Sequence, residues 1–241
     1  MKKILAMVLA MVLMLSAAAL AEGTVSVTLS DVQFVSADET FGLNPAVTAT
    51  MGATDTSAWV ELTASVNGEA VIVGQLQVVD NTLYASVDGA NDALVINDFD
   101  AQMAAYGADT TSADFIDAVN TLVALEDGSD DLDSIIEEFN AEQEGVTLEK
   151  VADNQVKFTI AVEDDCDITF VLTVEGSDVA EFADLSAKNA VELTEEDIAN
   201  GTTPDSDVIT VAAEKLTTLM SEESVAAMIA AISEAGTEEA A

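Results

Sequence analysis

The sequence predicts a single α+β domain in which an antiparallel β-meander packs on a central helical insert and on C-terminal helices. Two blocks of period-two alternation, over about residues 24–97 and 146–193, predict the strands. Helical spacing of apolar residues over about 112–143 and 204–235 predicts the helices. No linker rich in Pro, Gly or Ser separates the blocks, and 50% of the residues are hydrophobic, so one domain with a substantial core is expected.

The N-terminal segment has the pattern of a secretory signal peptide. Two lysines precede an apolar run that is shorter than the ~20 residues needed to span a bilayer. The run ends in Ala19-Leu20-Ala21, a small-x-small cleavage site. We therefore expect cleavage after Ala21, a secreted (extracellular or periplasmic) protein, and no stable membrane insertion. The domain would then span residues 22–236, followed by a disordered tail over 237–241.

The first strand block shows its two faces clearly. Val25, Val27 and Leu29 alternate with Ser and Thr, so one side of this strand is apolar and the other is polar. Further alternating runs are separated by short Asn, Asp and Gly turns such as Asn67-Gly68. Short strands joined by such turns predict an antiparallel meander with one dry face.

The central helical insert is predicted from both spacing and capping. Apolar residues recur at helical spacing from Phe115 to Val123, and Thr111 and Asp114 are placed as a capping box. A second helical run begins near Leu132, after a break that contains glycine. Two helices are therefore expected between the strand blocks.

The second strand block resembles the first. Residues 156–176 align without gaps on residues 60–80, and the even-numbered positions are apolar in both segments. Two hairpins of similar pattern, over residues 60–80 and 156–176, are therefore predicted. After them, Thr203-Pro204-Asp205 supplies an N-cap, a proline at the first helical position and an acid in the first turn, which predicts the start of the closing helices.

An acidic segment over residues 125–139 places seven carboxylates in fifteen positions. Asp127, Asp131 and Glu138 match oxygen positions of a calcium loop of the EF-hand type, but Leu132 stands where that loop requires glycine. Because the segment also has helical periodicity, we interpret it as the solvated face of a helix. The sequence predicts no cofactor and no specific metal site, although divalent cations could bind loosely to the acidic surface. If a calcium site exists, Asp127, Asp131 and Glu138 are its expected ligands.

The charge balance excludes several functions. Beyond the signal peptide there are 46 acidic residues, four lysines, no arginine and no histidine. Nucleic acid needs cationic side chains for its phosphates, so it is not an expected partner. Catalysis by a histidine-activated nucleophile is impossible, and phosphate clamps built on arginine are absent. We therefore predict that the protein is not an enzyme.

The order of elements and hairpins such as VELTASVNGEAVIVGQLQVV (60–79) resemble the half-barrel of LolA/LppX-type exported lipoprotein folds. The resemblance covers most of residues 24–220, although the residue directly after the cleavage site is Glu22 and not the cysteine of a lipoprotein. It implies a curved antiparallel sheet that wraps helices and encloses an apolar ligand cavity.

Two functions remain as hypotheses. If the half-barrel holds, the protein binds an apolar small molecule or lipid between sheet and helices. The alternative is an acidic extracellular or cell-surface interaction module that binds cations or a basic partner. For the first hypothesis, alternating residues of the two hairpins are the expected lining of the cavity: Val66, Ile72, Leu76, Phe158, Ile160, Phe170 and Leu172.

Overall fold

A computed structural model describes most of the chain between residues 24 and 225. The calcium candidates Asp127 and Asp131 and the expected signal peptide lie outside the described residues. So does the predicted last helix, apart from Val225. The described residues are 24–36, 40–42, 45–105, 111–123, 132–142, 145–163, 166–177, 182–202, 204–222 and 225.

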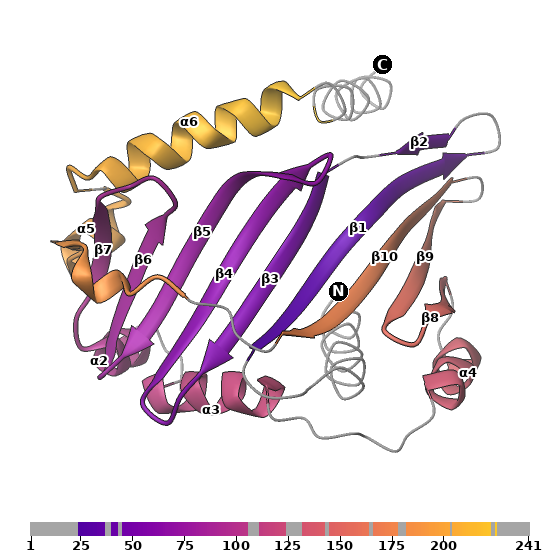
Figure 1. Cartoon of the computed structure of the whole chain (residues 1–241), viewed down its shortest axis with the longest axis horizontal. Helices are drawn as coiled ribbons and strands as arrows, with labels where there is room; N and C mark the ends of the chain where they lie inside the picture. Colours follow the sequence, from indigo (N-terminus) through magenta and orange to yellow (C-terminus); the bar gives the residue numbers. More distant parts are fainter. Residues whose placement is uncertain are drawn as a thin grey trace.

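The strands form one 11-stranded sheet (Figure 1). In spatial order it runs β11-β7-β6-β5-β4-β3-β1-β10-β9-β8, with β2 paired to β1, and its pairs are antiparallel except that β11 runs parallel to β7. β1 pairs with both β3 and β10 and so joins the two predicted strand blocks into one sheet. The strands are β1 Thr24–Ser36, β2 Thr40–Gly42, β3 Pro45–Ala53, β4 Ser57–Val66, β5 Glu69–Val79, β6 Thr82–Val87, β7 Asp92–Ile96, β8 Val146–Ala152, β9 Gln155–Glu163, β10 Cys166–Ser177 and β11 Asn189–Glu192.

The α+β class and the antiparallel sheet are thus confirmed. The sheet is open, with β8 and β11 at its two edges, and the curvature of a half-barrel stays a prediction. None of the helices that the structure describes is long and apolar enough to cross a membrane. Those helices are α2 Phe99–Ala105, α3 Ser112–Val123, α4 Leu132–Glu142, the 3-10 helix η1 Leu185–Ala187, α5 Glu195–Asn200 and α6 Asp207–Ser221.

The two helices predicted for the central insert are present as α3 and α4, whereas α2, which precedes them, was not predicted. The capping box of α3 is formed at Thr111, whose backbone N donates to Asp114 Oδ2 at 2.8 Å while the Asp114 N donates to Thr111 Oγ1 at 3.1 Å. The closing helix differs from the prediction, because α6 begins at Asp207 and its N-cap is Ser206 rather than Thr203. The Ser206 hydroxyl accepts from the N–H of Val208 at 3.2 Å, which satisfies one of the free donors of the first turn.

The two faces of the sheet differ as the alternation predicts. Residues that are direct cross-strand partners lie on the same face, so each row of partners shows the character of that face. One row across β1, β3, β4, β5 and β6 is entirely apolar: Val25, Met51, Val60, Leu76 and Ala85. The neighbouring row on the opposite face is polar: Ser26, Thr50, Glu61, Gln75 and Ser86.

Three helices pack on the apolar face, which we call the helix-bearing face (Figure 1). The α4 cluster joins Ile136 and Phe139 to residues of β1, β8, β9 and β10. The α3 cluster joins Ile116 and Val119 to the sheet near Ala58. In the α6 cluster, Val208, Val211 and Ala212 pack on Ile72, Val87, Ala90 and Leu94.

A strap over residues 182–188 lies on the opposite, polar face. The ring of Phe182 stacks on Trp59 with 5.8 Å between centroids, and Leu185 is 1% exposed. The Leu185 N donates to the buried Gln77 Oε1 at 2.8 Å, and Lys188 Nζ donates to Ser86 Oγ at 2.8 Å. These contacts anchor the strap that leads to β11 (Figure 1).

Candidate functional site

The helix-bearing face is incompletely covered at its centre. On β3 and β4, Val47 and Leu62 are 46% and 45% exposed, although both lie on the face that the helices cover elsewhere. Ala49 pairs with Leu62, Ala64 pairs with Val47, and Gly74 of β5 pairs with Leu62. We call these five residues the central patch.

Small side chains keep the central patch open. Three of its five members are alanine or glycine, so no bulky neighbour stands beside Leu62 within its row. A Cβ added at Gly74 would meet only the Leu62 carbonyl oxygen, at 3.9 Å, which is an ordinary contact. Glycine inside a strand often marks a place where a ligand or another backbone approaches closely.

Packed clusters border the central patch on three sides. Leu29, the partner of Val47, packs into the α4 cluster, and Met51 packs into both the α3 and α4 clusters. Ile72, the partner of Ala64, packs into the α6 cluster. In Figure 1, α6 and α3 lie at opposite ends of the strands, and the middle of β3 and β4 is free of labelled helices. The central patch is therefore the part of the sheet surface that lies between the α3, α4 and α6 clusters.

One carboxylate fixes the start of α6 at the connection between β6 and β7. Asp207 Oδ2 accepts from the backbone N of Asn91 at 2.9 Å and from its Nδ2 at 3.0 Å, and Oδ1 accepts from the N of Asp92 at 3.0 Å. In return, the Asp207 N donates to Asp92 Oδ2 at 3.0 Å. The bond from the Asn91 N–H is the main cause that lowers the pKa of Asp207 below its ordinary value.

All seven residues predicted to line a cavity lie on the helix-bearing face, but they fall into two groups. Phe158, Ile160, Phe170 and Leu172 are on β9 and β10, where the rings of Phe158 and Phe170 stack with centroids 4.7 Å apart. Phe158, Phe170 and Leu172 are part of the α4 cluster and so belong to the packed core. The other group, on β4 and β5, lies nearer the central patch: Val66, Ile72 and Leu76.

Sequence reasoning missed the most exposed members of the site, Val47 and Leu62, and also Gly74. Alternation did place Val47 and Leu62 among apolar positions of β3 and β4. Gly74, the single glycine within the otherwise regular alternation of β5, is the sequence signal that could have identified the central patch. No local pattern showed which part of the face a helix would leave uncovered.

Of the three alternative calcium ligands, the structure describes only the backbone of Glu138. Glu138 lies within α4, as the helical interpretation of the acidic segment predicted, whereas Asp127 and Asp131 are outside the described residues. Within the described ranges, no group of three or more Asp, Glu or Cys side chains is placed to hold a metal ion.

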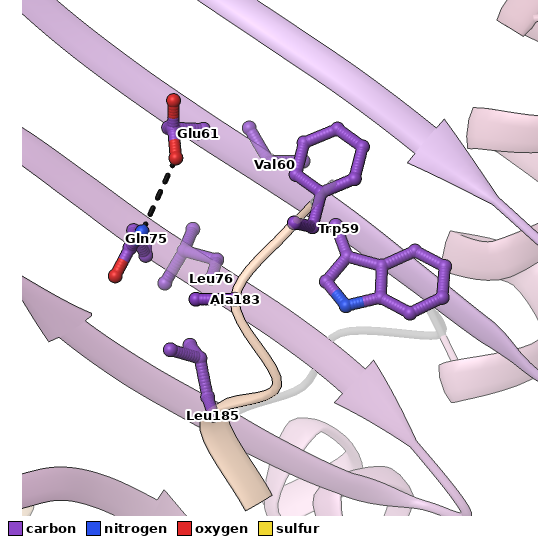
Figure 2. Close-up of a pocket in the computed structure, with 8 residues that line it drawn as sticks. Trp59, Val60, Glu61, Gln75, Leu76, Ala183 and Leu185 are labelled. Atoms are coloured by element: carbon purple, nitrogen blue, oxygen red, sulfur yellow. Dashed lines mark hydrogen bonds between the residues drawn. The ribbon is translucent and has the colours of Figure 1, made fainter. Parts of the chain in front are cut away.

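A small pocket lies on the opposite face beneath the strap (Figure 2). In it, Gln75 Nε2 donates to Glu61 Oε2 at 3.2 Å, and the backbone around Ala183 and Leu185 closes one side. Its volume is about 10 Å³, which is room for about one water molecule. This pocket is too small for an organic ligand.

Chemically, the central patch offers aliphatic surface and no acid, base or nucleophile. It can hold a hydrocarbon by apolar contact, and it cannot by itself activate a reacting group. No protein-family model matches this chain, and no curated protein matches it either.

Proposed function

We propose that this is a secreted, non-enzymatic protein that binds an apolar or lipid-like ligand between its sheet and its helices. The observation that carries the proposal is the exposure of Val47 and Leu62 at the centre of an otherwise helix-covered apolar face. Contiguous apolar surface that stays exposed can mark a site where a ligand binds. The resemblance to LolA/LppX-type half-barrels implies the same location for a ligand.

The energetics are consistent with reversible binding. Fully burying one Val or Leu side chain contributes about 1.5–3 kcal/mol, so covering the exposed part of Val47 and of Leu62 contributes about 1 kcal/mol each. Each methylene of the ligand contributes about 0.8 kcal/mol when it leaves water. A hydrocarbon chain that lies along the central patch would therefore supply most of its own binding free energy.

The first test is native mass spectrometry of the mature protein purified from its own secretion. We expect a mass above that of the polypeptide by the mass of a bound apolar molecule, which organic extraction removes. A polypeptide without added mass, together with no binding of any apolar probe in solution, would contradict the proposal.

A pair of variants locates the site. Val47→Asp places a carboxylate in the central patch, where a ligand would have to desolvate it, and should weaken binding of an alkyl probe by about tenfold or more. Val151→Asp is the matched control, because Val151 is also a strand valine, is 53% exposed, and lies on the edge strand β8. Equal binding by the two variants would place the ligand elsewhere.

A further inference from the structure

We infer that the central patch selects lipids with an uncharged headgroup and rejects those with an anionic headgroup. This inference rests on the ligand site proposed above and adds the chemical class of the ligand. Its basis is the position of every cationic side chain that the mature chain possesses. The four are Lys150, Lys157, Lys188 and Lys215, with no arginine or histidine in the sequence.

Two of the lysines already pair with carboxylates. Lys150 Nζ lies 3.2 Å from Asp153 Oδ1 and 3.5 Å from Asp133 Oδ2. These partners raise the pKa of Lys150, chiefly through the hydrogen bond to Asp153, so this lysine stays protonated at neutral pH. Lys215 Nζ of α6 lies 3.5 Å from Asp88 Oδ2. An anionic ligand would have to compete with these carboxylates.

The other two lysines are on the opposite side of the sheet. Lys188 belongs to the strap and donates to Ser86 Oγ at 2.8 Å and to the Ala90 carbonyl oxygen at 2.9 Å. Lys157 is next to Phe158 along β9, and successive residues of a strand point to opposite faces. Since Phe158 belongs to the α4 cluster, Lys157 is on the polar face. Among the residues that the structure describes, no unengaged lysine side chain faces the central patch.

Carboxylates are also scarce on this part of the helix-bearing face. Within β3–β6, all of whose residues the structure describes, the register places only Glu69 there, opposite Val66 at the end of the β4–β5 hairpin. A cationic headgroup over the central patch would therefore lack a partner in the patch itself. An anionic headgroup would lack one too, and it would also meet the repulsion of a chain with 46 acidic residues. The same negative charge attracts a cationic headgroup at long range, whereas an uncharged headgroup avoids both the desolvation cost and the repulsion that an anionic headgroup meets.

The test compares three soluble amphiphiles that share a dodecyl-length chain: monododecanoylglycerol, dodecanoate and dodecyltrimethylammonium. Each is titrated below its micelle concentration into the mature protein at neutral pH, and binding is followed by calorimetry. We expect the glycerol ester to bind about tenfold more tightly than dodecanoate. Dodecanoate binding as tightly as the ester, or as tightly as the ammonium probe, would overturn the inference and leave the proposed function intact. Absence of binding by all three would overturn the ligand site, and the inference with it.

A charge-introducing variant tests the cause. Leu62→Lys puts a cation on the central patch at a half-exposed position where a long side chain can reach water. Leu62→Gln is its control, because it removes the same apolar surface without adding charge. We expect dodecanoate to bind Leu62→Lys about tenfold more tightly than Leu62→Gln, with the glycerol ester unchanged between them. Equal dodecanoate binding by the two variants would show that the missing cation is not what excludes anions.

Discussion

The sheet under α4 and the central patch follow the same alternating pattern and differ in what covers them. On β9 and β10, Phe158 and Leu172 are 2% and 3% exposed, because Ile136 and Phe139 of α4 pack on that part of the sheet. On β3 and β4, Val47 and Leu62 are about half exposed. Both sets lie on the helix-bearing face of one continuous sheet.

The difference shows that periodicity determines the face of a residue and not its neighbours. Seven even-numbered residues of the two hairpins, among them Val66 and Phe158, were expected to line one cavity, since the hairpins repeat the same pattern. The aromatic pair Phe158 and Phe170 instead packs against α4. In the central patch, Ala49, Ala64 and Gly74 have small side chains or none, so they do not cover Val47 and Leu62. The same alternating pattern therefore produces a packed core on β9 and β10 and an exposed apolar surface at the central patch.

The largest predicted effect compares one substitution in the two regions. Leu172→Ala removes a buried side chain from the α4 cluster and should lower the free energy of unfolding by about 2–5 kcal/mol. Leu62→Ala removes a half-exposed side chain and should cost about 1 kcal/mol or less. Chemical denaturation of both variants measures the two costs. Equal losses would mean that the central patch is packed as tightly as the core.

A smaller effect, of opposite sign, is expected at Gly74. Gly74→Val should raise the free energy of unfolding by about 0.5–1 kcal/mol, since valine favours a strand and its Cβ meets no close contact. The added side chain should also occupy the ligand's place and weaken binding of an alkyl probe. Gly42→Val in β2 is the control, because a Cβ there also has room, 3.8 Å from the nearest atom, but β2 lies beyond the central patch. Stabilisation without loss of binding would contradict the proposed location of the ligand.

The smallest effect concerns the pH dependence of α6, which borders the central patch. The pKa of Asp207 is lowered in the folded protein, so its contribution to stability is present above the pKa of an unfolded aspartate and is lost as pH falls through the lower folded value. Asp207→Asn should therefore melt at a lower temperature than the wild type at neutral pH, with the gap closing in acid. Asp205→Asn, at an exposed neighbour, should leave the melting temperature unchanged. A gap for Asp207→Asn that persists in acid would contradict this assignment.

The sequence was sufficient for the features that depend on local spacing. Period two predicted the strands and the common face of all seven proposed lining residues, and Thr111 with Asp114 predicted the start of α3. The start of α6 was misplaced, because it depends on the bonds of Asp207 to Asn91 and Asp92, which are more than one hundred residues away along the chain. The Trp59–Phe182 stack that anchors the strap is equally non-local.

The candidate site was predicted only in outline for the same reason. Val66, Ile72 and Leu76 were assigned to the correct strands near the uncovered region. Exposure of Val47 and Leu62 depends on where three helices, distant in sequence, end on the sheet. Spacing within one strand carries no information about that placement.

Photolabelling tests most directly whether the central patch binds the ligand: an alkyl diazirine is bound to the protein, which is then irradiated. Peptide mass spectrometry locates the adducts, and an excess of unlabelled alkyl ligand should suppress them. Adducts concentrated on the β3, β4 and β5 peptides, around Val47, Leu62 and Gly74, are the predicted result. Adducts concentrated on β9 and β10, or labelling that the competitor does not reduce, would contradict the claim that the central patch binds the ligand.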